Sequence, residues 1–156
     1  MAEIWSVPTW IFFHSLAEKI NEDFLKTHTP QVIHIIKQIC FNLPCPHCRE
    51  HATAYCNNLI VEKIKNKDDL IQFLYIFHNN VNARLKKPIY DKKILKKYKR
   101  VRLDVVFSTF LYGFMKKYSR TLYAGNLSQD GKRRNAGRYI NTWTRTHWKT
   151  LQGFPA

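Results

Sequence analysis

Apolar residues recur along this chain at intervals of three and four, the spacing that places them on one face of a helix. One such stripe occupies residues 10–24. A second follows the helix-start signal Thr29-Pro30 and occupies residues 32–43. It ends before Pro44, because the residue preceding a proline leaves the helical region. The pattern predicts two amphipathic helices.

Two further helices are predicted in the middle of the chain. One begins at the motif Cys45–Cys48 and runs toward Asn57. The other begins at residues 68–69, two aspartates that suit the positive end of a helix dipole, and carries the apolar stripe 70–85. A short basic helix is expected over residues 91–98.

The pattern changes beyond Arg100. Residues 105–118 predict another helix, and residues 136–151 predict a last one. Between them, residues 125–137 are rich in Gly, Asn and Ser and predict a turn-rich connection. The fold class that follows is all-α.

Composition adds a strong positive charge to this picture. The chain has 156 residues, 45% of them hydrophobic, which is enough for one folded core. Its formal net charge is +15, with Lys and Arg crowded in residues 86–102 and 116–145. Such a field attracts polyanions, including nucleic acid, acidic proteins and cofactor phosphates. The alternative is a basic face that is simply solvated.

No signal peptide or transmembrane segment is predicted. The longest apolar stretch, residues 105–115, is shorter than the ~20 residues that cross a bilayer. We therefore expect a cytosolic or nuclear setting, where a CxxC motif is more often catalytic or metal-binding than structural.

The CxxC motif Cys45-Pro46-His47-Cys48 is the strongest chemical signal in the chain. A cysteine at a helix N-terminus lies next to free backbone N–H groups and the positive end of the dipole, and both favour the thiolate. A thiolate is the reactive form in disulfide exchange. This placement favours redox chemistry.

Zinc binding is the competing interpretation. The cysteines at 40, 45, 48 and 56 and the histidine at 51 supply enough ligands. A second closely spaced ligand pair, usual in structural zinc sites, is absent. On this interpretation the chain is a zinc-binding basic module that interacts with nucleic acid.

The predicted fourth helix carries polar residues close to its apolar stripe. His78 and Asn82 are four residues apart and so share a helix face. Asn79 and Lys87 lie near the same helix end. Polar groups on an inward face need partners, so this cluster indicates either a satisfied core histidine or a bound polar ligand.

At this point the sequence resembles the Erv/ALR-type FAD-dependent sulfhydryl oxidases, in the form encoded by large DNA viruses. Three blocks match in order and together cover residues 5–98. They are Thr9-Trp10-x3-His14-x2-Ala17, Cys45-x2-Cys48-x2-His51 and His78-Asn79-x-Val81-Asn82-x2-Leu85-x-Lys87-Pro88.

The resemblance implies a four-helix bundle with a short fifth helix that holds FAD. Residues 1–99 would form this FAD-binding sulfhydryl oxidase domain. Residues 100–156 have no counterpart in the family that we can align and would form a basic, helical C-terminal extension. A homodimer through the first two helices is also implied.

The resemblance further implies the reaction. Cys45 would be the distal thiol that exchanges with a client, and Cys48 the proximal thiol beside the flavin. Electrons would pass from client thiols to the Cys45–Cys48 disulfide, then to FAD and to O2, giving H2O2. The client would be a thiol-containing protein or a small dithiol relay protein, in the host cytoplasm, a viral factory or the virion. The residues expected to bind FAD are Trp10, His14, His51, His78, Asn79, Val81, Asn82, Leu85, Lys87 and Tyr90.

The chain departs from the family pattern at several positions. Tyr75 and Lys92 occupy the positions of a structural disulfide that clamps the fourth helix to the fifth in cellular members. Lys86 replaces the glycine usual before the motif lysine. Cys40 and Cys56 are not close in sequence, as shuttle pairs usually are, and we expect two buried helix thiols.

Overall fold

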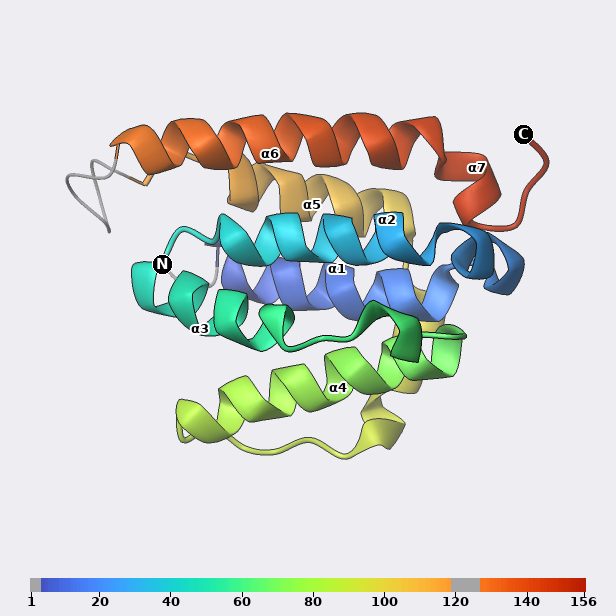
Figure 1. Ribbon diagram of the computed structural model, residues 1–156, viewed down its shortest axis with the longest axis horizontal. Helices are drawn as coiled ribbons and strands as arrows, with labels where there is room; N and C mark the ends of the chain where they lie inside the picture. Colours follow the sequence, from blue (N-terminus) through green and yellow to red (C-terminus); the bar gives the residue numbers. More distant parts are fainter. Residues whose placement is uncertain (1–3, 119–126) are drawn as a thin grey trace.

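The computed structural model describes residues 4–118 and 127–156, and every regular element in this part of the chain is helical (Figure 1). The all-α prediction is therefore confirmed. The elements are α1 (Ser6–Lys19), α2 (Glu22–Phe41), α3 (Pro46–Asn57), the 3-10 turn η2 (Val61–Lys63), α4 (Lys67–Arg84), the 3-10 segment η3 (Lys92–Arg100), α5 (Leu103–Met115), α6 (Leu127–Thr146) and α7 (Trp148–Leu151).

Helices α1 and α2 lie in the middle of the molecule, between two outer layers (Figure 1). On one side, α4 and η3 pack on α1, and α3 packs on α2. On the other side, α5 packs on α1, and α6 and α7 pack on α2. The expected four-helix bundle with a short fifth helix is thus present, and the C-terminal helices cover its opposite face.

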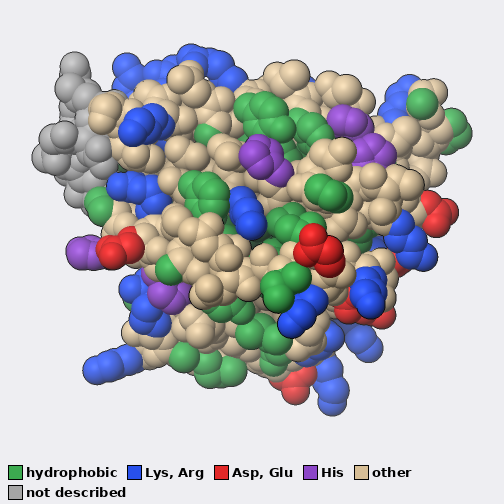
Figure 2. Space-filling model, viewed as in Figure 1, with side chains coloured by type: hydrophobic (Ala, Val, Ile, Leu, Met, Phe, Trp, Pro, Cys, Tyr) green, Lys and Arg blue, Asp and Glu red, His purple; other side chains and the backbone are tan. Residues whose placement is uncertain are grey.

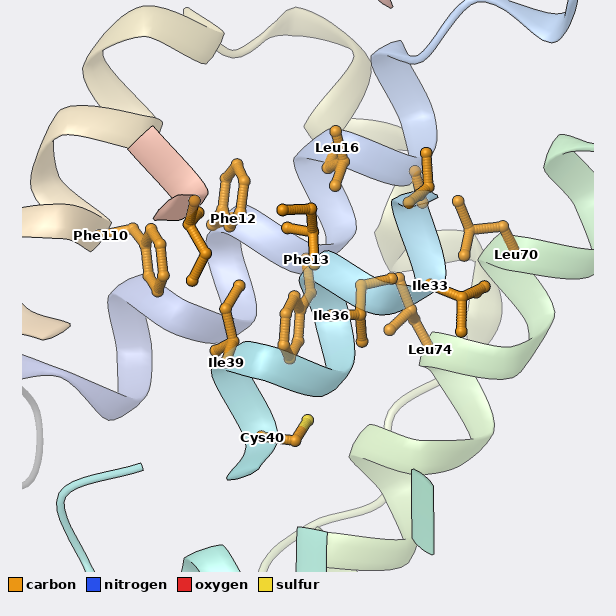
Figure 3. Close-up of a cluster of buried hydrophobic side chains, with 14 of the residues drawn as sticks. Phe12, Phe13, Leu16, Ile33, Ile36, Ile39, Cys40, Leu70, Leu74 and Phe110 are labelled. Carbon is orange, nitrogen blue, oxygen red and sulfur yellow. The ribbon is translucent and has the colours of Figure 1, made fainter. Parts of the chain in front are cut away.

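A single buried cluster joins the two sides of the molecule (Figure 3). Phe12 of α1 stacks on Phe110 of α5, with ring centroids 4.7 Å apart. Its neighbour Phe13 belongs to the same cluster and lines a cavity on the α3–α4 side. Since both phenylalanines are almost fully buried, α1 contributes buried side chains to the packing on both of its sides.

The boundary between the first two helices differs from the prediction. The first stripe was expected to run to Phe24, but α1 ends at Lys19 and α2 begins at Glu22. Asn21 explains this, because its side chain accepts a hydrogen bond from Phe24 N and caps α2. The start signal at Thr29-Pro30 marks a kink within α2, next to the non-helical His28.

The turn-rich connection predicted over residues 125–137 is wrong in its described part, since α6 already begins at Leu127. Residues 125–126 lie outside the described residues. The helix is held by Arg133, which is 1% exposed and donates to Phe114 O (2.7 Å) and Lys116 O (2.8 Å). Arg133 also pairs with Asp130 one turn earlier. These contacts with the end of α5 outweigh the weak helix propensity of the local sequence.

Basic side chains are spread over the face shown in Figure 2, where few acidic groups accompany them. Among the described residues, no helix is long and apolar enough to cross a membrane.

Candidate functional site

The CxxC motif opens α3 as the sequence predicts. Cys45 is the N-cap residue, and its sulfur accepts a hydrogen bond from Cys48 N at 3.3 Å. Pro46 occupies the first turn, where no backbone hydrogen bond is lost. Arg49 fixes the turn that precedes the helix by donating to Leu43 O at 2.9 Å. The motif is therefore built on a rigid helix start.

The two cysteines of the motif have different surroundings. Cys48 lines a small cavity of about 60 Å³ enclosed by α1, α2, α3 and α4. His51, one turn further along α3, lines the same cavity. Cys45 is not among the residues that line it, although both thiols are only partly buried. The pair thus has one member that faces a cavity in the bundle and one that does not.

The acidity of Cys48 differs from the expectation. Burial raises the pKa of the Cys48 thiol to about 12, and a hydrogen bond with Cys45 adds to the rise. The positive charge of Arg84 acts in the opposite direction. The predicted preference for a thiolate therefore does not hold for Cys48 in the dithiol state, because desolvation outweighs the helix N-terminus.

A second cavity, of about 310 Å³, lies between α1, α4 and η3. Nine of the ten residues expected to bind the cofactor line it, and the tenth, His51, lines the smaller cavity. The nine are Trp10, His14, His78, Asn79, Val81, Asn82, Leu85, Lys87 and Tyr90. Residues far apart in the sequence are thus gathered round one space.

The two cavities share a wall, and together we call them the elongated site. The residues that line both are Ser6, Trp10, Val81 and Leu85. The indole of Trp10 stacks on the imidazole of His78, with ring centroids 4.0 Å apart and planes within 3°. The site therefore runs from Cys48 past a stacked aromatic pair to the surface beside η3.

His14 and His78 hydrogen-bond through Nε2 and Nδ1 at 2.9 Å. Burial lowers the pKa of His14 to about 3, with contributions from the charges of His78 and Lys97. Burial also lowers the pKa of His78 to about 4, with contributions from Lys87 and Lys97. Both imidazoles are neutral at pH 7, so one donates to the other.

Four residues of η3 also line the larger cavity but were missed by the sequence analysis, and two of them, Lys97 and Tyr98, are polar. Lys97 adds a second cation to Lys87, and Tyr98 stacks on His14 with ring centroids 5.3 Å apart. The basic run in which they lie gave no signal to distinguish them from solvated neighbours. Only the packing of η3 on α1 selects them.

Hydrogen bonds tie α4 to the segment before η3, where the disulfide of the cellular relatives is missing. Asn79 Nδ2 donates to Tyr90 O at 2.9 Å, and Tyr90 N donates to Asn79 Oδ1 at 3.1 Å. Tyr75 Oη donates to the same carbonyl oxygen at 2.9 Å. Lys92 donates to Gln72 at 2.6 Å. Tyr75 and Lys92, the two positions of the missing disulfide, therefore both take part in this set of hydrogen bonds, which we call the clasp.

Lys86, at the position of the usual glycine, has a φ of 55°. It follows the C-cap residue of α4, and Lys86 N donates to Ala83 O at 3.1 Å. This left-handed conformation is the one that glycine adopts without strain at a helix C-terminus. The backbone thus keeps the glycine geometry with a lysine in place.

The elongated site fits a flat aromatic cofactor that carries phosphates. Trp5 Nε1 and His51 Nδ1 are buried, belong to residues that line the smaller cavity, and have no hydrogen-bond partner among the described residues. Such atoms need a polar partner, as the edge of a heterocyclic ring would offer. Lys87 and Lys97 at the other end suit phosphate groups.

Zinc binding would need at least three His, Cys, Asp or Glu side chains in one place, and residues 4–118 and 127–156 contain no such group. An open hollow of about 560 Å³ lies between α5 and the α6–α7 end, and no cysteine or histidine lines it.

Comparison with known proteins gives matches that centre on the same part of the chain. The model of the Erv1/Alr family matches residues 7–102. A protein of Invertebrate iridescent virus 3 named as an FAD-linked sulfhydryl oxidase is 30% identical over 104 residues, which cover 65% of this chain and 70% of the relative. One of Invertebrate iridescent virus 6, named likewise, is 30% identical over 100 residues, covering 60% and 90%.

African swine fever virus has a further relative. In the Warthog/Namibia isolate, the FAD-linked sulfhydryl oxidase is 32% identical over 109 residues, which cover 70% of this chain and 88% of the relative. No solved structure matches the chain.

Proposed function

The chain belongs to the Erv1/Alr family, and on that premise we propose that it is an FAD-linked thiol oxidase that makes disulfide bonds in client proteins through Cys45 and Cys48. The observation that carries the proposal is the position of Cys48. It lines a cavity that shares a wall with the aromatic and cationic pocket, whereas Cys45 does not.

FAD is the cofactor that the family membership and the viral relatives support. When bound, it accepts two electrons and passes them to O2, which gives H2O2. We propose that His51 contacts the ring near Cys48 and that the residues of the larger cavity hold the remainder. These are Trp10, His14, His78, Asn79, Val81, Asn82, Leu85, Lys87 and Tyr90, with Lys97 and Tyr98 added from the structure.

The protein's own part of the reaction is a thiol–disulfide exchange. A client thiolate attacks the sulfur of Cys45, a mixed disulfide forms, and Cys48 is released facing the cavity. The client's second thiol then attacks the mixed disulfide and frees Cys45. The positive charge of Arg84 favours the thiolate of the released Cys48. The surrounding apolar wall limits water at that sulfur.

The partners are proposed from the same chemistry. The client is a thiol-containing protein or a small dithiol relay protein, and O2 is the final acceptor. Because the relatives compared are viral, we propose that the protein acts in the host cytoplasm, in a viral factory or in the virion.

We also propose a division of labour along the chain. Residues 1–99 carry the redox site, and residues 100–156 form an extension whose helices α5, α6 and α7 pack on α1 and α2. The resemblance implied a homodimer through the first two helices. Since α5 and α6 lie on α1 and α2, we propose that a homodimer of this protein uses a different surface.

Oxygen uptake tests the proposed function. The purified protein is expected to be yellow, to release FAD on heat denaturation, and to consume O2 and form H2O2 with dithiothreitol. Cys45→Ser and Cys48→Ser are expected to abolish turnover with a protein dithiol, whereas Thr109→Ala, an exposed change on α5, is expected to leave it intact. Colourless protein with stoichiometric zinc, or turnover that survives Cys48→Ser, would overturn the proposal.

A further inference from the structure

Two cysteines outside the CxxC motif are brought together by the fold. Cys40 lies in the last turn of α2, after Ile36 and Ile39 in the row of side chains seen in Figure 3. Cys56 lies in the last turn of α3. The two thiols are near enough for each to shift the pKa of the other, and their residues are 1% and 0% exposed. They are sixteen positions apart in the sequence but form one buried dithiol.

This buried dithiol lies beside the redox site. Cys40 lines the same small cavity as Cys48, and the segment from Cys40 to Cys56 contains both residues of the CxxC motif. An oxidant in solution cannot reach thiols that are this deeply buried. Among the described residues that line this cavity, Cys48 is the only other cysteine, so we take it as the group that reacts with Cys40.

We propose that Cys40 and Cys56 form a second disulfide couple, which links α2 to α3 and is oxidised by the Cys45–Cys48 disulfide. The proposal rests on the proposed function, because that activity re-oxidises Cys45 and Cys48. The substrate of this exchange is an intramolecular dithiol, and its oxidant is the neighbouring disulfide.

The exchange balances as follows. The sulfur of Cys40 attacks that of Cys48, the Cys45–Cys48 bond breaks, and Cys45 leaves and takes up a proton. Cys56 then attacks Cys40, a Cys40–Cys56 bond forms, and Cys48 leaves and takes up the second proton. Two electrons and two protons have moved from one dithiol to the other disulfide.

The electrostatic interaction between the two buried thiols suits this exchange. It lowers the pKa of Cys56, assisted by the charge of Lys37, and it raises the pKa of Cys40 together with burial. Cys56 is thus the more acidic thiol of the pair, which suits it to attack Cys40 in the second step.

The expected consequence is a covalent loop around the CxxC motif. A disulfide between Cys40 and Cys56 would close that segment and restrict the unfolded chain. We expect the melting temperature of the holoenzyme to be higher by about 5–10 °C in the oxidised than in the reduced state, apart from any contribution of the Cys45–Cys48 bond. Cys56→Ser should remove this difference.

Peptide mapping of the holoenzyme tests the proposal. The enzyme is equilibrated in air without reductant, free thiols are blocked with N-ethylmaleimide in acid, and the chain is digested with trypsin without reduction. Cleavage after Lys37, Arg49 and Lys63 places Cys40 in peptide 38–49 and Cys56 in peptide 50–63. We expect these peptides to be joined, with the link assigned to Cys40 by fragmentation.

The Cys48→Ala variant provides the matched comparison. It keeps Cys40 and Cys56 but lacks the proposed oxidant, so the two peptides should be separate and alkylated. Separate peptides in the wild-type enzyme, or equally joined peptides in Cys48→Ala, would overturn the proposal. Oxygen uptake is measured on the same wild-type sample. Unlinked peptides in an active enzyme overturn the second couple alone, whereas absent uptake overturns the proposed function and the couple with it.

Discussion

His14 Nε2 and His78 Nδ1 lie 2.9 Å apart, so that one hydrogen bond joins α1 to α4 inside the larger cavity. Both imidazoles are shielded from water and face the cations of η3, and their pKa values fall to about 3 and about 4. A neutral pair can keep this bond, whereas a doubly protonated pair has two donors and no acceptor. The packing of α1 on α4 is therefore expected to depend on pH.

The stability of the protein is predicted to fall in mild acid. Below about pH 6.5 the unfolded chain protonates its histidines while folded His14 stays neutral, so the unfolded state binds more protons. The free energy of unfolding should then decrease by up to about 1.4 kcal/mol per pH unit from His14, with a smaller loss from the less buried His78. Above about pH 7 this contribution is constant.

Urea denaturation at several pH values measures this slope. His14→Gln, which does not titrate, should flatten the dependence between about pH 6.5 and about pH 4. His34→Gln, a change at an exposed histidine of α2, should leave it unaltered. An equal slope in wild type and His14→Gln would contradict this account of the pair.

Replacing Lys86 by glycine is predicted to stabilise the protein. A non-glycine residue in the left-handed region costs about 1–2 kcal/mol, and the greater freedom of glycine in the unfolded chain offsets part of this gain. The net increase in the free energy of unfolding should be about 0.5–1 kcal/mol, measured by urea denaturation.

Lys96→Gly is the matched control, because Lys96 is an exposed lysine of η3 without a positive φ. It should leave stability unchanged or lower it. A destabilised Lys86→Gly variant would show that the lysine side chain contributes more than its backbone strain costs.

Local signals were sufficient to predict much of the redox half of the fold. Pro44 and Cys45 marked the start of α3, and Asp68 and Asp69 marked the first turn of α4. In these places the sequence within one helical turn determines the boundary. The family resemblance likewise assigned His78, Asn79 and Asn82 of α4 to one site, and all three line the larger cavity.

Features that depend on tertiary packing could not be predicted. The start of α6 depends on Arg133 reaching carbonyl groups of α5, nineteen positions away in the case of Phe114. The meeting of Cys40 with Cys56 depends on how α2 packs on α3. Asn21 was the exception, because an N-cap signal was present but lay inside an apolar stripe and was overlooked.

The clasp between Asn79 and Tyr90 is predicted to support cofactor binding. Asn79→Ala removes two hydrogen bonds that hold Tyr90 at the edge of the larger cavity. We expect the loss of these bonds to reduce the free energy of FAD binding by about 1 kcal/mol, which weakens binding by about five- to tenfold. Titration of the apoprotein with FAD measures this change.

Asn79→Asp provides an intermediate case. It keeps the oxygen that accepts from Tyr90 N and loses the donor to Tyr90 O. Its affinity for FAD should therefore lie between those of the wild type and Asn79→Ala. FAD affinity that is unchanged in Asn79→Ala would contradict a role for the clasp.

The central claim is that electrons from thiols reach FAD through Cys48. It is tested most directly by mixing the FAD-loaded protein with a reduced dithiol protein in the absence of O2 and following the visible absorbance of the flavin. The account predicts that the wild-type flavin bleaches, whereas the Cys48→Ala variant binds FAD but keeps its colour. Flavin that bleaches in Cys48→Ala as fast as in the wild type would contradict the claim.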